Sequence, residues 1–279
     1  MPAVTAVTIA LFGVLGLFFG SWANIVIRRV PAGGSPDTLT GNCAGCDAPI
    51  SWVDALPLIS YFRLAGKCRD CGSPIPVRYP LTEISTAALW VFAAAYYGPS
   101  IRASFAAALF SLLLILTQID IETRRLPNPI VGLTAIIGVA GVLVSTAGAL
   151  FGTEALSALP LLNTTWSPLL NGILGPLFTA GPATVIALLY ILVRGKSGFG
   201  AGDIKLLMAL GFFFGAHGLL ILPISAALSI VGIIVGSLGG KRFGLTSEFP
   251  YGPYIALAAM VVAIWGEQMV AAYLNYLLG

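Results

Sequence analysis

Charged side chains are scarce in this sequence. Of its 279 residues, 58% are hydrophobic and only 9% are charged, whereas charged residues make up about 25% of an ordinary soluble domain. This composition excludes a soluble globular protein and indicates a chain that lies in a lipid bilayer.

Three further scarcities narrow the possible chemistry. Histidine occurs once, as His217, in a predicted external turn where we expect no catalytic role. The glycine fingerprint of dinucleotide-binding folds is missing, so no motif of this kind predicts a bound cofactor. Cysteine occurs only four times, and all four cysteines lie in the one segment predicted to be soluble, residues 28–79.

Apolar stretches long enough to cross a bilayer recur along the whole chain. About 20 helical residues span the hydrocarbon layer of roughly 30 Å. We therefore predict an all-α integral membrane protein with about eight transmembrane helices. Their expected ranges are 3–27, 80–97, 101–119, 129–150, 168–193, two within 203–238 that are separated by a break at "GAHG" (215–218), and one that starts near 253.

The basic residues orient this bundle. Thirteen of the fourteen Lys and Arg residues fall on one side of the predicted topology, and only Arg102 falls on the other. Because Lys and Arg accumulate in cytoplasmic loops, we expect residues 28–79 inside the cell and both termini outside. Residues 151–167 form the main external loop in this scheme. The net charge of +3 is explained by the same rule, so it does not indicate nucleic acid binding.

The cysteines form two Cys-x-x-Cys pairs, "CAGC" at 43–46 and "CRDC" at 68–71, with 21 residues between them. This is close to the spacing of four-thiolate zinc sites. Two disulfides, a redox dithiol or free thiols are the alternatives, but disulfides seldom persist in a reducing cytoplasm. A segment of about 50 residues buries little core, so we predict that structural zinc holds it folded. The expected ligands are Cys43, Cys46, Cys68 and Cys71.

Carboxylates within membrane segments are functional candidates because a charge at the bilayer centre costs about 2.5 to 3.5 kcal/mol. Asp120 ends the third predicted span and Asp203 begins the sixth, on the same side and at similar depth. Two such aspartates can hydrolyse a peptide, one taking a proton from water while the other donates to the carbonyl and the leaving amine. Six of the eleven acidic residues lie at or within membrane ends: Glu83, Asp120, Glu122, Asp203, Glu248 and Glu267.

Each aspartate also has an ordinary structural interpretation. Asp203 could cap a helix, and Asp120 with Glu122 could belong to an interfacial charge cluster with the arginines that follow. The "GFGAGD" stretch before Asp203 brings glycines that let backbone approach a substrate closely. A Gly-x-Gly-Asp pattern alone does not decide between these interpretations.

Five blocks in order resemble the bacterial type IV prepilin peptidase family, the prepilin leader peptidases and N-methyltransferases, which are membrane aspartic proteases of the Gly-x-Gly-Asp kind. The blocks are "FFGSWANIVIRRVP" (18–31), the cysteine loop with "LPLISY" and "GKCRDCGSPIPVRYPLTE", "IDIETRRLPN", "GAGDIKLLMALG", and "FPYGPYIALAA" (249–259). The resemblance covers much of the chain.

The resemblance implies that Asp120 and Asp203 are the catalytic dyad and that Gly200 and Gly202 shape the cleft beside it. Its substrates would be prepilins or pseudopilins, whose basic leader is cleaved after a glycine at the cytoplasmic face of a bacterial plasma membrane. Many members then methylate the new amino terminus with S-adenosylmethionine. Glu83 could accept the proton of that amine, or could be a boundary charge near Arg78.

The resemblance also implies a division into a first transmembrane helix (1–27), a zinc-binding segment associated with methyl transfer (28–79) and a transmembrane peptidase core (80–279). Two other functions are kept open. One is a peptidase without methyl transfer. The other is a transporter or membrane scaffold whose acidic pair moves protons or ions, and which would depend on a gradient in sealed vesicles.

Overall fold

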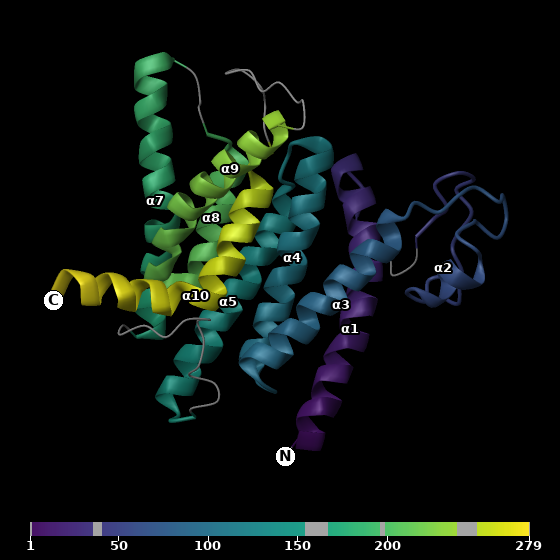
Figure 1. Ribbon diagram of the computed structural model, residues 1–279, viewed down its shortest axis with the longest axis horizontal. Coiled ribbons are helices and arrows are strands. Elements are labelled where there is room, and N and C mark those ends of the chain that lie inside the picture. Colours follow the sequence, from purple (N-terminus) through teal and green to yellow (C-terminus); the bar gives the residue numbers. More distant parts are fainter. Residues whose placement is uncertain (1, 36–40, 154–166, 196–198, 239–249, 279) are drawn as a thin grey trace. The chain divides into compact units, whose positions relative to one another are not determined.

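The computed structural model describes residues 2–35, 41–153, 167–195, 199–238 and 250–278. Most of the predicted external loop at 151–167 and the acidic residue Glu248 lie outside the described residues, as does Phe249 at the start of the last sequence block. Within the described ranges the regular elements are all helical (Figure 1). The helices form two compact units, Met1–Ile115 and Leu116–Gly279.

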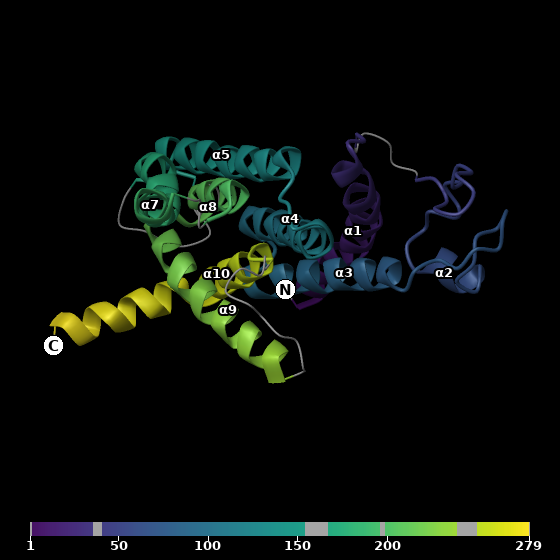
Figure 2. The ribbon, with the colours of Figure 1, turned by 90° about the horizontal axis from the view of Figure 1, so that it is seen from above.

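The first unit is built on α1 (Pro2–Arg29) and α3 (Arg78–Tyr97), which lie against each other (Figures 1 and 2). Glycines on α1 permit this contact. A Cβ on Gly16 would lie 2.7 Å from the Cα of Ala87, and one on Gly20 would lie 2.6 Å from the Cα of Glu83. Small residues four apart let membrane helices approach backbone to backbone. The close approach also brings Glu83 beside the last turns of α1.

Between α1 and α3 the chain forms a short 3-10 helix, η1 (Val30–Ala32), then a loop that contains the cysteines and one short helix, α2 (Ile59–Arg63). The greater part of α4 (Ile101–Thr123) also belongs to the first unit. There the Trp90 indole Nε1 donates a buried hydrogen bond of 2.8 Å to the Ser111 hydroxyl, which joins α3 to α4.

The second unit contains the end of α4 and the remaining helices: α5 (Asn128–Leu150), α7 (Pro168–Arg194), α8 (Ala201–Phe214), η2 (Gly215–Leu220), α9 (Ile221–Leu238) and α10 (Gly252–Leu278). Figure 2 shows α8 beside both α5 and α7. A Cβ on Gly175 of α7 would lie 2.1 Å from the Gly211 carbonyl of α8, so these helices touch through their backbones.

A helix break interrupts the long apolar stretch at 201–238, as predicted for "GAHG". Helix α8 ends at Phe214, and η2 separates it from α9. Gly215 has a φ of +54°, a left-handed conformation that favours glycine. The predicted break is therefore confirmed.

The all-helical membrane architecture is confirmed, but the count of eight spans is not. Helix α3 carries Arg78 and Glu83 in its first turns and is not among the segments that are long and apolar enough to cross a bilayer. The stretch 201–238 counts as one such segment, although η2 interrupts its α-helix. Within the described residues, six segments are long and apolar enough to cross a bilayer: Thr5–Ala32, Ile101–Thr123, Asn128–Leu150, Pro168–Arg194, Ala201–Leu238 and Gly252–Leu277.

Candidate functional sites: a carboxylate pair and a four-cysteine loop

Asp120 lies in the last turn of α4 and is held by a helix that is distant in sequence. Its carboxylate Oδ2 accepts a hydrogen bond of 2.9 Å from the backbone N–H of Gly252, the first residue of α10. The Asp120 side chain is buried, with 5% of the residue exposed. A helix start offers free N–H groups and a favourable dipole to an anion, so α10 fixes this carboxylate in place.

Asp203 lies in the first turn of α8. The N-cap residue of α8 is Gly200, and no side chain caps it, so Asp203 is the third residue of the helix rather than its cap. A Cβ on Gly200 would lie 2.6 Å from the Asp203 Oδ2. Gly202 is also closely packed, because a Cβ there would lie 3.1 Å from the Leu126 Cβ. Glycine at these positions therefore leaves room for the carboxylate and for the neighbouring chain.

The two aspartates lie near each other within the second unit. Although 83 positions separate them in the sequence, their carboxyl groups are close enough to interact electrostatically. Glu122 is exposed two residues after Asp120. The Lys205 ammonium donates to the Asn128 side-chain oxygen at 3.0 Å, so it links α8 to α5. The acidic groups that the second unit brings near each other are thus Asp120 and Asp203.

The dipeptide Tyr251–Gly252 reaches both aspartates, and sequence reasoning assigned it no role. Gly252 binds Asp120, while Tyr251 interacts electrostatically with Asp203. The Tyr251 hydroxyl is 2.7 Å from the Ser225 Oγ of α9, and its ring packs edge-on against Phe199 at 5.4 Å between centroids. Two sequence signals covered it: the block "FPYGPYIALAA" that resembles the family, and "YGP", where a proline at the second helical position marks a helix start.

The four cysteines of the first unit come together as predicted. One Sγ atom from each of Cys43, Cys46, Cys68 and Cys71 lies within 4.8 Å of the others, and all four are free thiols. The Sγ atoms of Cys43 and Cys71 are 3.8 Å apart. A tetrahedral zinc with bonds of about 2.3 Å would separate its sulfur ligands by about 3.8 Å. The donor set and its spacing fit a zinc ion.

Two matching backbone turns build this cluster. Cys43 donates from its backbone N–H to the Ala48 carbonyl, and Cys68 donates to the Ser73 carbonyl in the same way. The backbone N–H of Ile50 donates to the Gly41 carbonyl, and the backbone N–H of Ile75 donates to the Gly66 carbonyl. The stretches "GNCAGCDAPI" and "GKCRDCGSPI" are thus one motif used twice. Each copy presents two thiols to the centre.

Hydrogen bonds within the turns favour the thiolate form of Cys43. The Gly45 backbone N–H lies 3.3 Å from the Cys43 sulfur, and this hydrogen bond, followed by one from the Ser73 hydroxyl, lowers the pKa of Cys43 to about 6. Thiolate is the form that binds metal. Ser73 is also 3.0 Å from the Cys71 sulfur, so this hydroxyl contacts one thiol from each turn.

Glu83 lies at the junction between the cysteine loop and the helices of the first unit. It is 8% exposed, and its Oε2 accepts a hydrogen bond of 2.8 Å from the Leu58 N–H. It lines an open cavity of about 160 Å³ whose wall carries acidic groups, arginines such as Arg69, and Asn24. Asn24 is 1% exposed, and its side-chain oxygen has no hydrogen-bond partner among the described residues. Acidic and basic side chains thus line this cavity together with apolar ones such as Ile25.

Comparison with known proteins gives matches along nearly the whole chain. Residues 14–97 match the model of the bacterial peptidase A24 N-terminal domain, and residues 107–237 match that of the type IV leader peptidase family. No solved structure gives a significant match.

Curated relatives are prepilin leader peptidases/N-methyltransferases. The protein of Stutzerimonas stutzeri is 31% identical over 94% of this chain and 92% of its own length. That of Pseudomonas aeruginosa is 32% identical with the same coverage. That of Klebsiella pneumoniae is 36% identical over 73% of this chain and 84% of its own length.

Proposed function

Because this chain belongs to the prepilin leader peptidase/N-methyltransferase family, we propose that it removes the leader peptide from prepilins or pseudopilins and then methylates the new amino terminus. The observation that carries the peptidase assignment is the pairing of Asp120 with Asp203 in one unit. The proposed location is a bacterial plasma membrane, with both termini outside and the dyad and cysteine loop at the cytoplasmic face.

The two carboxyl groups divide the work of hydrolysis. One carboxylate removes a proton from the attacking water, and the other carboxyl group donates a proton to the substrate carbonyl and later to the leaving amine. The Gly252 N–H holds the Asp120 oxygen at 2.9 Å, which orients that carboxyl group before substrate arrives. Gly200 and Gly202 form the wall on the Asp203 side. A substrate leader that ends at the membrane surface would meet the pair there.

Gly252→Ala is expected to lower the rate of leader cleavage by roughly 10- to 100-fold, because small displacements of catalytic groups have effects of that size. The added Cβ would lie 2.9 Å from the Asp120 Oδ2 and 3.1 Å from its Cγ, so the carboxylate must move. The measurement is the initial cleavage rate of a purified prepilin in detergent. Gly132→Ala is the matched control, since a Cβ at Gly132 would have no neighbour within 4 Å in the part of the chain that the structure describes. Equal rates for the two variants would show that the Gly252 contact does not orient the dyad.

Zinc has a structural role in this proposal. Cys43, Cys46, Cys68 and Cys71 would hold the ion and thereby fold residues 28–79, which carry few buried apolar side chains. The four-thiolate set leaves no open position for a substrate or a water molecule. The ion therefore stabilises the loop and takes no part in the chemistry.

Methyl transfer is assigned to the cavity beside Glu83. When bound, S-adenosylmethionine supplies an electrophilic methyl group. The lining fits a molecule with charges of both signs, because it offers Glu83, arginine side chains and the Asn24 oxygen, which no described residue binds. Glu83 would take the proton that the substrate amine loses as its nitrogen gains the methyl group. This division places cleavage in the second unit and methyl transfer in the first.

Glu83→Gln is expected to lower N-methylation by at least about 100-fold, the usual contribution of a general base, and to leave leader cleavage unchanged. Glutamine keeps a carbonyl oxygen that can accept from the Leu58 N–H, so the loop junction is preserved. Mass spectrometry of the product separates the two steps. Asp70→Asn, which alters another acidic group of the same cavity, should retain methylation. Full methylation by Glu83→Gln would refute the assignment of the base.

The complete proposal is tested with purified prepilin, the full-length protein in detergent, and S-adenosylmethionine present or absent. Loss of the leader without the cofactor, and a further gain of one methyl group with it, are the expected results. Cleavage without any methyl gain would support a peptidase alone. No cleavage of any cognate prepilin, combined with proton or ion flux in sealed vesicles, would favour the transporter or scaffold.

A further inference from the structure

Three large apolar side chains face solvent on the loop between α1 and α3. Trp52, Ile59 and Phe62 are 74, 63 and 75% exposed. We call this group the Trp52 face. Isolated exposed apolar residues are common, but these three occur within residues 52–62 of one loop, which points to an interaction surface. The face belongs to neither the carboxylate pair nor the cysteine cluster.

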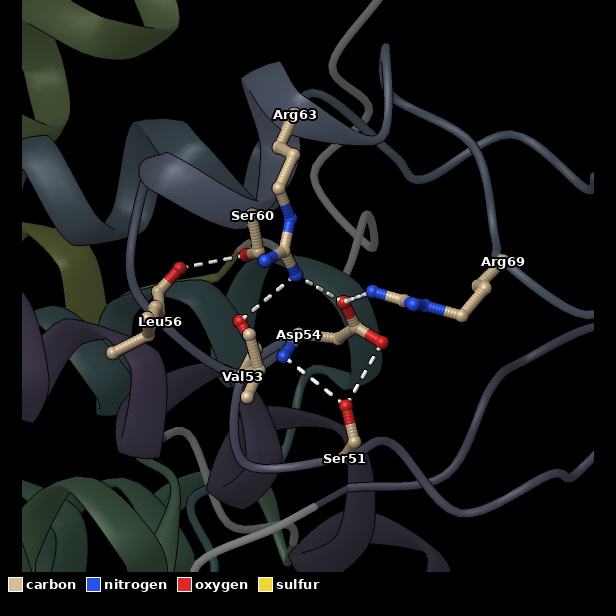
Figure 3. Close-up of polar contacts among 7 residues, drawn as sticks. All are labelled: Ser51, Val53, Asp54, Leu56, Ser60, Arg63 and Arg69. Atoms are coloured by element: carbon tan, nitrogen blue, oxygen red, sulfur yellow. Dashed lines mark hydrogen bonds and ion pairs between the residues drawn. The ribbon is translucent and has the colours of Figure 1, made fainter.

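An ion-pair clamp joins the two segments that carry the face. The Asp54 Oδ1 accepts from the guanidinium of Arg63 at 2.5 Å and from that of Arg69 at 2.6 Å (Figure 3). The Ser51 hydroxyl donates to the other Asp54 oxygen at 2.9 Å. The pKa of Asp54 is lowered chiefly because Arg69 donates to it, so the carboxylate stays ionised. The clamp therefore ties the turn that bears Trp52 to α2, whose last residue is Arg63.

A second contact fixes α2 on α3. Leu58, immediately before α2, has a φ of +60°, a conformation that is uncommon for leucine. The backbone N–H of Leu58 donates a hydrogen bond to the Glu83 carboxylate of α3. Ile59 and Phe62 then lie three residues apart on one side of α2. At the start of α3, Val77 and Leu81 are also exposed. The chain thus holds these apolar side chains outward rather than leaving them on an unconstrained loop.

We propose that the Trp52 face lies in the headgroup layer of the same bilayer that α1 crosses. Tryptophan is enriched at membrane interfaces because its ring is apolar and its N–H is polar. Residues 51–70 carry three cations, Arg63, Lys67 and Arg69, and two acids, Asp54 and Asp70. Arg63 and Arg69 are paired with Asp54, and the segment keeps a net charge of +1, the sign that suits anionic headgroups. The loop follows directly from α1, a helix long and apolar enough to span the membrane.

This contact would hold the cysteine loop and its cavity at the membrane surface. The amino terminus of a membrane helix emerges at that depth, so the anchor would keep the cavity within reach of a cleaved substrate. The binding of lipid does not depend on the proposed peptidase or methyltransferase activity. It can therefore be tested, and can fail, separately.

The test uses the full-length protein in lipid nanodiscs that contain an anionic lipid. The chain has five tryptophans, so the Trp52 signal is the difference between the emission of the wild type and that of Trp52→Phe. With lipids brominated next to the headgroup, we expect this difference to fall by at least half. Lipids brominated at the acyl chain ends should quench it less, and aqueous iodide should scarcely affect it.

The variant Phe62→Ser provides a second test. It removes the most exposed member of the face, and shallow lipid quenching of Trp52 should weaken while the zinc content per chain is unchanged. Two results would overturn the proposal. Quenching of Trp52 by iodide but not by brominated lipid would show that the face is in water. Quenching by neither reagent would show that another part of the chain or a second copy covers it.

Discussion

Asp120→Asn and Asp203→Asn are each expected to reduce leader cleavage by at least about 1,000-fold, because neither carboxyl group of a dyad can perform both proton transfers. An asparagine at 120 could still accept a hydrogen bond from the Gly252 N–H, so the contact between α4 and α10 is retained. The measurement is the fraction of prepilin that has lost its leader, followed over time by mass spectrometry.

Two controls separate chemistry from folding. Glu122→Gln changes an exposed carboxylate two residues from Asp120 and should leave the cleavage rate near that of the wild type. Both dyad variants should still methylate a pilin that has already lost its leader, because that step is assigned to the first unit. Cleavage that persisted in both Asp variants would show that other groups perform the hydrolysis.

Replacement of a cysteine is expected to have the largest effect on stability. Structural zinc contributes about 10 to 16 kcal/mol in small zinc-binding peptides at neutral pH, so Cys43→Ser or Cys71→Ser should remove the ion and unfold residues 41–79. Elemental analysis should give one zinc per chain for the wild type and none for these variants. Hydrogen exchange in the loop should become fast, and N-methylation should be lost.

Leader cleavage should survive the same replacements, because the dyad lies in the other unit. Ser73→Ala is the matched control: it removes a hydroxyl that contacts two of the thiols without removing a ligand, so zinc should remain. A wild-type protein that contains no zinc and no titratable thiols would instead support the disulfide alternative. Equal zinc content in wild type and cysteine variants would exclude the four-cysteine site.

The contrast between α3 and the other helices explains why the span count was harder to predict than the fold class. A chain with 58% hydrophobic residues must be membrane-bound, and long apolar stretches predict where helices lie. Helix α3 combines Arg78 and Glu83 with apolar residues, so its composition alone does not classify it. Its packing on Gly16 and Gly20 of α1 decides its place in the first unit.

Several features were determined by the sequence alone. The two Cys-x-x-Cys turns, the break at 215–218, and the positions of Asp120 and Asp203 at helix ends are local properties, since each depends on residues that are neighbours along the chain. The partners of those residues were decided by the tertiary structure. Gly252 reaches Asp120 across 132 positions, and Glu83 meets Leu58 and the close-packed Gly20. Such contacts depend on how closely helices pack, which spacing within one segment does not encode.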